Sequence, residues 1–153
     1  MRRSRSTASA LVAVAVAAVG WLAWQELWAR GGDRPLAWRD LTGRALGEPS
    51  RSQLAVFGGD AAIRTALGSS ATVPPIDFGR REAVLVAAGP RSSTAFALDV
   101  VRVTEERRRI VVTIRERAPT LARPGTAALV FPFRLITIER TGKPVELAWD
   151  GRP

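Results

Sequence analysis

The sequence predicts an α+β protein that is mainly β: a single small antiparallel β domain with one short helix, preceded by an N-terminal transmembrane helix. Three observations lead to this prediction. An uncharged apolar run follows a basic N-terminus, several later segments read as strands, and one short segment has the start and stop signals of a helix. The length of 153 residues suits one domain better than two.

The start of the chain has the composition of a membrane-insertion element. Arg2, Arg3 and Arg5 precede an uncharged apolar run from residue 8 to residue 24. Positive residues before such a run hold the N-terminus in the cytoplasm and send the following chain across the membrane. At about 1.5 Å per residue, a helix over this run spans roughly 25 Å, slightly short of a typical hydrocarbon core. We therefore expect a single-pass protein of the cell membrane with an extracytoplasmic C-terminal domain.

Two fates of this leader compete. Residues 15–17 (Ala-Val-Ala) fit a signal peptidase site, but cleavage there would leave a short apolar run. Trp21, Trp24 and Trp28 instead resemble the aromatic belt at one end of a retained span. We favour an uncleaved signal anchor. The expected organisation is an anchor over residues 1–29, a Gly- and Pro-containing linker over residues 30–36, and a β-rich domain over residues 37–153.

The composition excludes several classes of function. The chain has no cysteine and no histidine, which removes disulfide scaffolds, thiol catalysis, the common zinc sites and the usual general base near neutral pH. We expect no metal site and no cofactor. The net charge of +9 does not indicate a nucleic-acid partner, because the arginines of the domain are interleaved with acidic residues rather than clustered. Anionic lipid headgroups are the favoured partner of any basic face.

The first half of the domain contains two predicted strands and the predicted helix. Residues 53–57 form a short apolar strand. Asp60 is expected to cap the N-terminus of a helix of about two turns, and Gly68 is expected to end it. Residues 83–88 are continuously apolar, which is typical of a central strand covered on both faces.

The second half is predicted to be strands alone. Residues 94–104 and 110–117 are expected to pair as a hairpin across a charged, solvated tip, and the apolar phase slips near Val100, which predicts a β-bulge. Pro132 limits the pairing of the strand that contains it. The remaining strand segments are residues 126–140 and 145–149.

The sequence contains no constellation to which a catalytic role is assigned. Asp77 and Asp99 are the two carboxylates with apolar neighbours, and a hydrolase that works with carboxylates would depend on them. A structural role is favoured for Asp77, since in PPIDF it is placed to accept backbone N–H bonds and fix a turn. The chain has no histidine that could act as a general base for the loop serines, so Lys143 is the only candidate base for them.

Part of the domain resembles a known family. The segments VPPIDFGRREAVLVAAGPRSSTAFALDVVRV, IVVTIRERAP and TAALVFPFRLITIER resemble, in order and spacing, the C-terminal domain of the PrcB family, whose members are associated with a surface protease complex. The resemblance covers about residues 73 to 140. Where the family has paired glycines before an aromatic residue, this chain has only Ala95. The landmarks are Pro75, Asp77, Phe78, Gly89, Thr94, Phe96, Pro119, Pro132 and Phe133.

The resemblance implies an exported, non-catalytic domain whose founding example supports the stability of a partner protease. We therefore expect a membrane-anchored protein-binding module that stabilises a partner such as an exported protease, through a strand edge or through loops. An envelope structural protein and a carboxylate-dependent hydrolase are the alternatives. The expected surface joins residues 89–96 to residues 118–125, with Arg91, Thr94, Phe96, Leu121 and Arg123 as candidate contacts.

Overall fold

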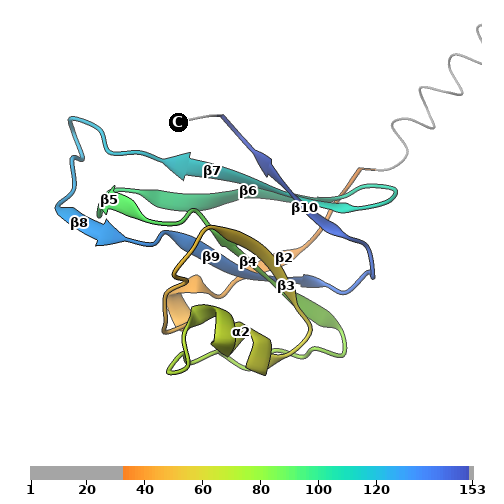
Figure 1. The fold of residues 1–153 in the computed structure, drawn as a ribbon. Coiled ribbons are helices and arrows are strands. Elements are labelled where there is room, and N and C mark those ends of the chain that lie inside the picture. The colour runs from red at the N-terminus through yellow and green to blue at the C-terminus, as the bar shows by residue number, and fades with distance from the viewer. Residues whose placement is uncertain (1–32, 152–153) are drawn as a thin grey trace, which may run out of the picture. The chain divides into compact units, whose positions relative to one another are not determined.

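The computed structural model describes residues 33–151, and the anchor expected over residues 1–29 lies outside the described residues. Among the described residues, no helix has the length and apolar character needed to cross a membrane. Residues 33–151 form two four-stranded sheets, a two-stranded ribbon, one α-helix and one 3-10 helix (Figure 1). The elements are β1 (Arg34–Pro35), β2 (Trp38–Asp40), η1 (Thr42–Arg44), β3 (Gln53–Phe57), α2 (Asp60–Leu67), β4 (Arg81–Ala87), β5 (Arg91–Ser93), β6 (Ala97–Glu105), β7 (Ile110–Arg117), β8 (Ala127–Val130), β9 (Phe133–Glu139) and β10 (Val145–Trp149).

The two large sheets have the strand orders β1-β6-β7-β10 and β2-β9-β4-β3, and β5 pairs with β8. The predicted antiparallel arrangement holds for every pair of named strands except one, because β10 runs parallel to β7. After β9 the chain leaves the second sheet and joins the first, so β9 and β10 do not form a hairpin. A parallel pair needs such a crossover.

The sheets pack face to face, and α2 covers the other face of the second sheet (Figure 1). Strand β4 lies in the middle of these three layers. Its Val84 and Val86 belong to the core between the sheets, whereas Ala83 and Leu85 belong to the core beneath α2. All four side chains are at most 1% exposed. The continuous apolar run at this position is thus explained, and the predicted central strand is confirmed.

Two local irregularities position the later strands. The register between β6 and β7 shifts between Val100 and Arg102, which confirms the predicted bulge. The long strand predicted over residues 126–140 is divided into β8 and β9, because Pro132 has no N–H to donate. Its carbonyl still accepts a 3.0 Å hydrogen bond from the Ala88 N–H. The first residues of the strand predicted over 94–104 instead form a turn, and β6 begins at Ala97.

Two predicted boundaries shift in the structure. Arg34 and Pro35, expected in the linker over residues 30–36, pair with β6, and the next side chain, Leu36, is only 5% exposed in the core between the sheets. Burial of Leu36 thus extends the folded domain to residues assigned to the linker. Asp60 is the first residue of α2 rather than its cap: Gly59 occupies the N-cap position and no side chain caps the helix. The prediction that Gly68 ends the helix is confirmed.

Candidate partner-binding surface

The two segments proposed from the sequence lie side by side at one end of the domain (Figure 1). Strand β5 from the first segment pairs with β8, which follows the second segment. Around this pair, the Thr94 N–H donates to the Thr126 carbonyl at 3.0 Å, and the Thr94 hydroxyl accepts from the Thr126 N–H at 2.9 Å. The Ser93 hydroxyl donates to the Pro124 carbonyl at 2.9 Å. The fold therefore assembles one surface from segments about thirty residues apart, while its binding role stays a prediction.

Gly125 allows the two segments to approach each other this closely. Its φ is +67°, and a Cβ at this position would lie 2.5 Å from the Ser93 hydroxyl oxygen and 2.6 Å from the Ala95 nitrogen. Only glycine fits both the left-handed backbone and the available space. Sequence reasoning did not single out this residue, although the Pro124-Gly125 dipeptide is an ordinary turn signal.

Arg91, one of the predicted contact residues, is bound within the domain. Its Nε and Nη2 atoms donate to the two carboxylate oxygens of Glu116 at 2.5 Å and 3.1 Å, and Nη1 donates to the Ala88 and Pro90 carbonyls. The Glu116 side chain is 4% exposed. The hydrogen bond with Glu116 raises the pKa of Arg91 above its usual value. Most donors of this guanidinium are used internally, so its direct effect is to fix β5 against β7.

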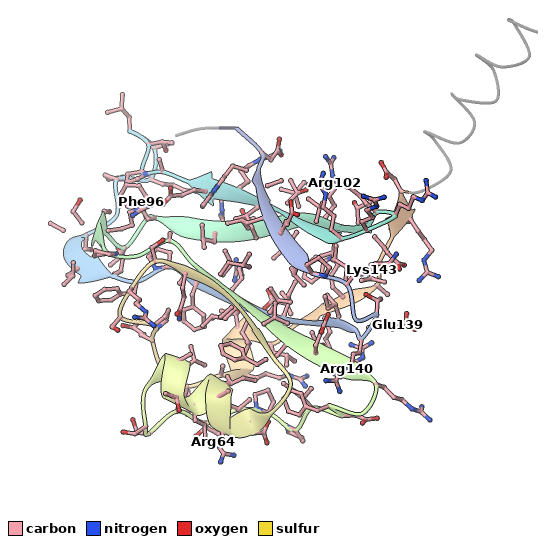
Figure 2. All side chains as sticks on the ribbon, turned by 45° about the vertical axis from the view of Figure 1, so that its right-hand side comes forward. Arg64, Phe96, Arg102, Glu139, Arg140 and Lys143 are labelled. Carbon is pink, nitrogen blue, oxygen red and sulfur yellow. The ribbon has the colours of Figure 1, made fainter. Side chains whose placement is uncertain are left out.

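Arg91 also orients a second predicted residue, Phe96. The guanidinium carbon lies 5.9 Å from the centre of the Phe96 ring, which is within the range of a cation–π contact. Phe96 follows the turn closed by its own N–H, which donates to the Ser93 carbonyl at 3.2 Å. The aromatic ring therefore has a defined position at this end of the domain (Figure 2).

The second segment presents apolar surface to solvent. The Thr120 and Arg123 backbones exchange hydrogen bonds of 3.1 Å and 2.9 Å, and this tight turn projects Leu121, whose side chain is completely exposed. On the neighbouring strand β8, Leu129 is 70% exposed. Sequence reasoning did not single out Leu129. Exposed leucines on converging segments are the apolar element that a protein interface needs.

Two depressions flank the turn from Thr94 to Ala97, and these two residues line both of them. The first has a volume of about 250 Å³, and its walls are mainly apolar side chains from the β8–β9 connection, together with Arg134. The second has a volume of about 630 Å³, and its lining includes Arg117, Thr120 and Arg123. An aromatic and a basic recess thus lie on either side of a single turn.

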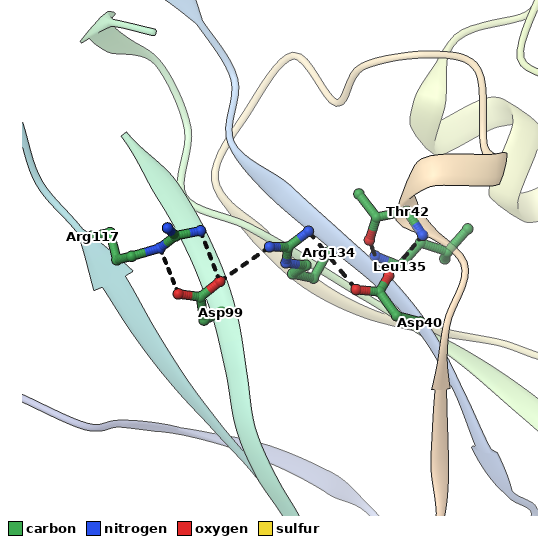
Figure 3. A network of polar contacts seen from close by, with 6 residues as sticks. All are labelled: Asp40, Thr42, Asp99, Arg117, Arg134 and Leu135. Atoms are coloured by element: carbon green, nitrogen blue, oxygen red, sulfur yellow. Dashed lines mark hydrogen bonds and ion pairs between the residues drawn. The ribbon is translucent and has the colours of Figure 1, made fainter. Parts of the chain in front are cut away.

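A network of partly exposed ion pairs joins the two sheets beside this surface (Figure 3). Asp99 of β6 binds Arg117 at 2.6 Å and Arg134 of β9 at 3.1 Å. Arg134 also lies 3.8 Å from Asp40, whose carboxylate accepts a hydrogen bond from the Thr42 N–H at 2.8 Å. Asp99 therefore links the first sheet to the second.

Asp77, the other carboxylate of the hydrolase hypothesis, belongs to a different part of the structure. Its Oδ1 accepts a 3.1 Å hydrogen bond from the Gly79 N–H, and its carbonyl accepts from the N–H groups of Arg80 and Arg81. These bonds build the turn that leads into β4, as predicted. Asp77 and Asp99 share no contact partner, so the structure does not assemble them into a carboxylate pair.

The other sequence motifs have structural positions. Lys143 donates to the Glu105 carboxylate at 2.8 Å and to the Glu106 carbonyl at 2.9 Å, and it contacts none of the loop serines. Phe78 and Phe133 pack against the core beneath α2. Gly89, with a φ of +82°, lies where a Cβ would be 3.3 Å from Ser52. Pro75 precedes the Asp77 turn, Pro119 follows β7, and Pro132 separates β8 from β9.

Comparison with known families gives one match. The model of the family described as PrcB C-terminal matches residues 83–139, a segment that contains most of β4, all of β5 to β9 and the whole of the candidate surface. Comparisons with curated proteins and with solved structures gave no match. The resemblance inferred from the sequence is thereby confirmed: residues 83–139 match the PrcB C-terminal family.

Proposed function

We propose that this chain is a membrane-anchored, extracytoplasmic module that binds a protein partner, such as an exported protease, and stabilises it without being catalytic itself. The family match supports association with a protease complex. The basic N-terminus and the apolar run after it support anchoring and export. The observation that carries the proposal is the surface formed by residues 89–96, residues 118–125 and the adjacent strand β8, in which Leu121 and Leu129 are exposed and ion pairs fix the base.

Physical reasons favour binding at this end of the domain. Recognition residues are often carried by loops that a rigid scaffold positions, and here Arg91 and Glu116 fix the loop base to β7. Burying one exposed leucine against a partner contributes about 2 kcal/mol. The two depressions beside Thr94 offer recesses for partner side chains, and Arg123 lies on the rim. An apolar centre with a polar rim is the usual anatomy of a specific interface.

Site-specific photo-crosslinking in the full-length chain tests the proposed surface. A crosslinker in place of Leu121 or Leu129 is expected to capture one defined partner in solubilised membranes. The matched control replaces Leu46, a leucine that is 67% exposed beside the loop at residue 72. The double variant Leu121→Asp/Leu129→Asp is expected to weaken recovery of the same partner at least about tenfold, whereas Leu46→Asp leaves it unchanged. Equal capture from all three positions, or none above an anchor-only chain, contradicts the proposal.

The identity of the captured partner tests the protease association separately. If the partner is an exported protease, its half-life in cells that lack this chain is expected to shorten. Return of the full-length chain restores the half-life, and the double leucine variant does not. A captured partner with unchanged lifetime supports binding but contradicts a stabilising role.

Anchoring and orientation are tested with a reporter that is active only outside the cytoplasm, such as alkaline phosphatase fused after residue 153. The proposal expects activity in the membrane fraction that alkaline washing does not release. Replacing Arg2, Arg3 and Arg5 by glutamate is expected to reduce that activity, because the positive charges set the orientation. Activity in the soluble fraction instead indicates a cleaved leader.

A further inference from the structure

Strand β3 forms an open edge of the second sheet. It pairs only with β4, from Gln53 opposite Ala87 to Phe57 opposite Ala83. Among the described residues, no backbone hydrogen bond joins residues 53–57 to any segment other than β4. An edge strand of this kind presents a row of N–H and C=O groups on which another strand can pair.

A groove runs along this edge between β3 and α2. Its volume is about 440 Å³. The strand side is formed by alternate residues of β3, and the helix side by residues at the spacing of one helical stripe. Most of the helix and strand positions are small, which leaves room for the side chains of an added chain. The lining residues are Ser50, Arg51, Gln53, Ala55, Phe57, Ala62, Thr65 and Ala66.

The two ends of the groove differ. At the start of β3, the preceding chain packs onto the end of α2: the Glu48 N–H donates to the Leu67 carbonyl at 3.1 Å, and a Cβ on Gly47 would lie 2.6 Å from that same oxygen. At the other end, Gly58 and Gly59 connect β3 to α2 without side chains, and a Cβ on Gly59 would meet nothing within 4 Å. A bound chain therefore has room to enter over the glycines and stops near Ser50.

The closed end carries the positive charge of the groove. Arg51 lines it and is exposed, and the ion pairs of the described residues do not include it. Ser50 lies on the same lining. A carboxylate is the group that an exposed guanidinium binds best, and the end of a chain supplies one where the chain must stop.

We propose that the groove between β3 and α2 binds the free carboxyl-terminal tail of a partner protein as an added strand. The tail runs antiparallel to β3, enters over Gly58 and Gly59, and places its terminal carboxylate at Arg51. Small or medium apolar side chains at alternate positions of the tail face Ala55, Ala62 and Ala66. The lining of this groove shares no residue with the loop surface of the proposed function, and the inference does not depend on that surface.

Fluorescence anisotropy with the full-length chain in detergent tests this inference. The probe is a labelled octapeptide of alternating threonine and valine with a free carboxyl terminus, and the competitor is the same peptide as its C-terminal amide. We expect saturable binding of the free acid and at least about tenfold weaker binding of the amide, because the amide loses a charge-assisted hydrogen bond. Arg51→Gln is expected to cause a similar loss for the free acid. The control Arg44→Gln, which changes an exposed arginine outside the groove, leaves the affinity unchanged.

Filling the groove gives a second, charge-independent test. Ala62→Trp is expected to abolish binding of the free acid, whereas Ala61→Trp, at the adjacent exposed position that does not line the groove, has no effect. On binding, the amides of residues 53–57 gain protection from hydrogen exchange. The double variant Leu121→Asp/Leu129→Asp keeps normal peptide affinity, so failure at one site is distinguishable from failure at the other.

Three results overturn the inference. Absence of saturable binding removes the site. Equal affinity for the acid and the amide, or an unchanged affinity in Arg51→Gln, removes the role of the terminal carboxylate. If the chain forms concentration-dependent dimers that protect residues 53–57 without peptide, the edge binds a second copy of the chain instead.

Discussion

The two ends of the domain use their charged residues differently (Figure 2). Near Lys143, the β6–β7 turn is a closed ionic cluster: Glu105 binds Arg34 and Lys143, each at 2.8 Å, and Arg109 binds Glu106 and Glu146 at 2.6 Å and 2.7 Å. Arg107, Arg108 and Arg109 of the predicted solvated hairpin tip are exposed, and the structure adds the ion pairs of Arg109. Near Phe96, ion pairs lie below the surface, while Leu121 and Leu129 are presented to solvent.

The Lys143 end stabilises the fold, whereas the Phe96 end presents a surface to solvent. The cluster at the Lys143 end joins β1, the β6–β7 hairpin and β10, and its charges are matched within the domain. Arginines also form ion pairs in the base of the Phe96 end. Its outer layer, however, is apolar, and two depressions flank its turn. Leu121 and Leu129 are among the most exposed large apolar side chains of the described residues, and this exposure favours a partner at this end.

The largest expected effect contrasts one ion pair from each end. Glu116→Ala removes a carboxylate that is 4% exposed and leaves the partly buried Arg91 without its partner, so we expect a loss of about 2 to 3 kcal/mol in the free energy of unfolding. Glu146→Ala removes an exposed partner of Arg109 and is expected to cost below about 1 kcal/mol. Urea unfolding of the full-length chain measures both. Similar losses in the two variants would mean that the ends do not differ in this way.

A smaller effect is expected at Glu82, a buried carboxyl on the core face of β4 whose Oε1 has no hydrogen-bond partner among the described residues. Burial raises the pKa of Glu82 above its ordinary value of 4.5, and Arg140 only partly opposes this. The folded state therefore favours the neutral form of Glu82. The stabilisation that results is complete below pH 4.5 and is lost as the pH rises through the folded-state pKa.

Glu82→Gln imitates the neutral form. At pH 7 we expect the variant to be about 1 kcal/mol more stable than the parent chain, with the gain disappearing below about pH 4. Unfolding midpoints measured across this pH range give the comparison. Glu139→Gln, an exposed carboxylate of β9, is the control and is expected to show no such gain. A gain that persists at low pH would assign the effect to packing rather than to charge.

The smallest effect is expected at the Lys143 end. Hydrogen bonds from Lys143 and then Arg34 lower the pKa of Glu105. Its contribution to stability is therefore present above the ordinary value of 4.5 and is lost as the pH falls through the lowered folded-state pKa. Lys143→Gln is expected to reduce stability slightly at neutral pH, and the difference should shrink at low pH and in high salt. A difference insensitive to both conditions would argue against an ionic origin.

Local signals predicted some elements because the residues that decide them are neighbours in sequence. The apolar run of β4, the phase slip at Val100 and the helix stop at Gly68 all follow from side-chain period or backbone freedom. The Asp77 turn is another such case, since its carboxylate binds a backbone group two residues away. These features form in the same way wherever the segment is placed.

The candidate surface was only partly predictable. The sequence indicated its two loops and the exposed residue Leu121, but Leu129, Gly125 and the Glu116 partner of Arg91 had no local signal strong enough to identify them. Each depends on a segment that lies far away in the sequence. The role of Asp99 likewise became visible only through Arg134, which reaches it from the other sheet.

By itself the sequence determined the mainly β class, the order of most strands, the family resemblance and the charge pattern of the leader, because these depend on composition, period and local turn chemistry. The tertiary structure alone decided that β10 runs parallel to β7, that β5 pairs with β8, and that β3 is left with an open edge beside α2. Pairing partners and packed faces are set by contacts across long stretches of chain, and no short window of sequence contains them.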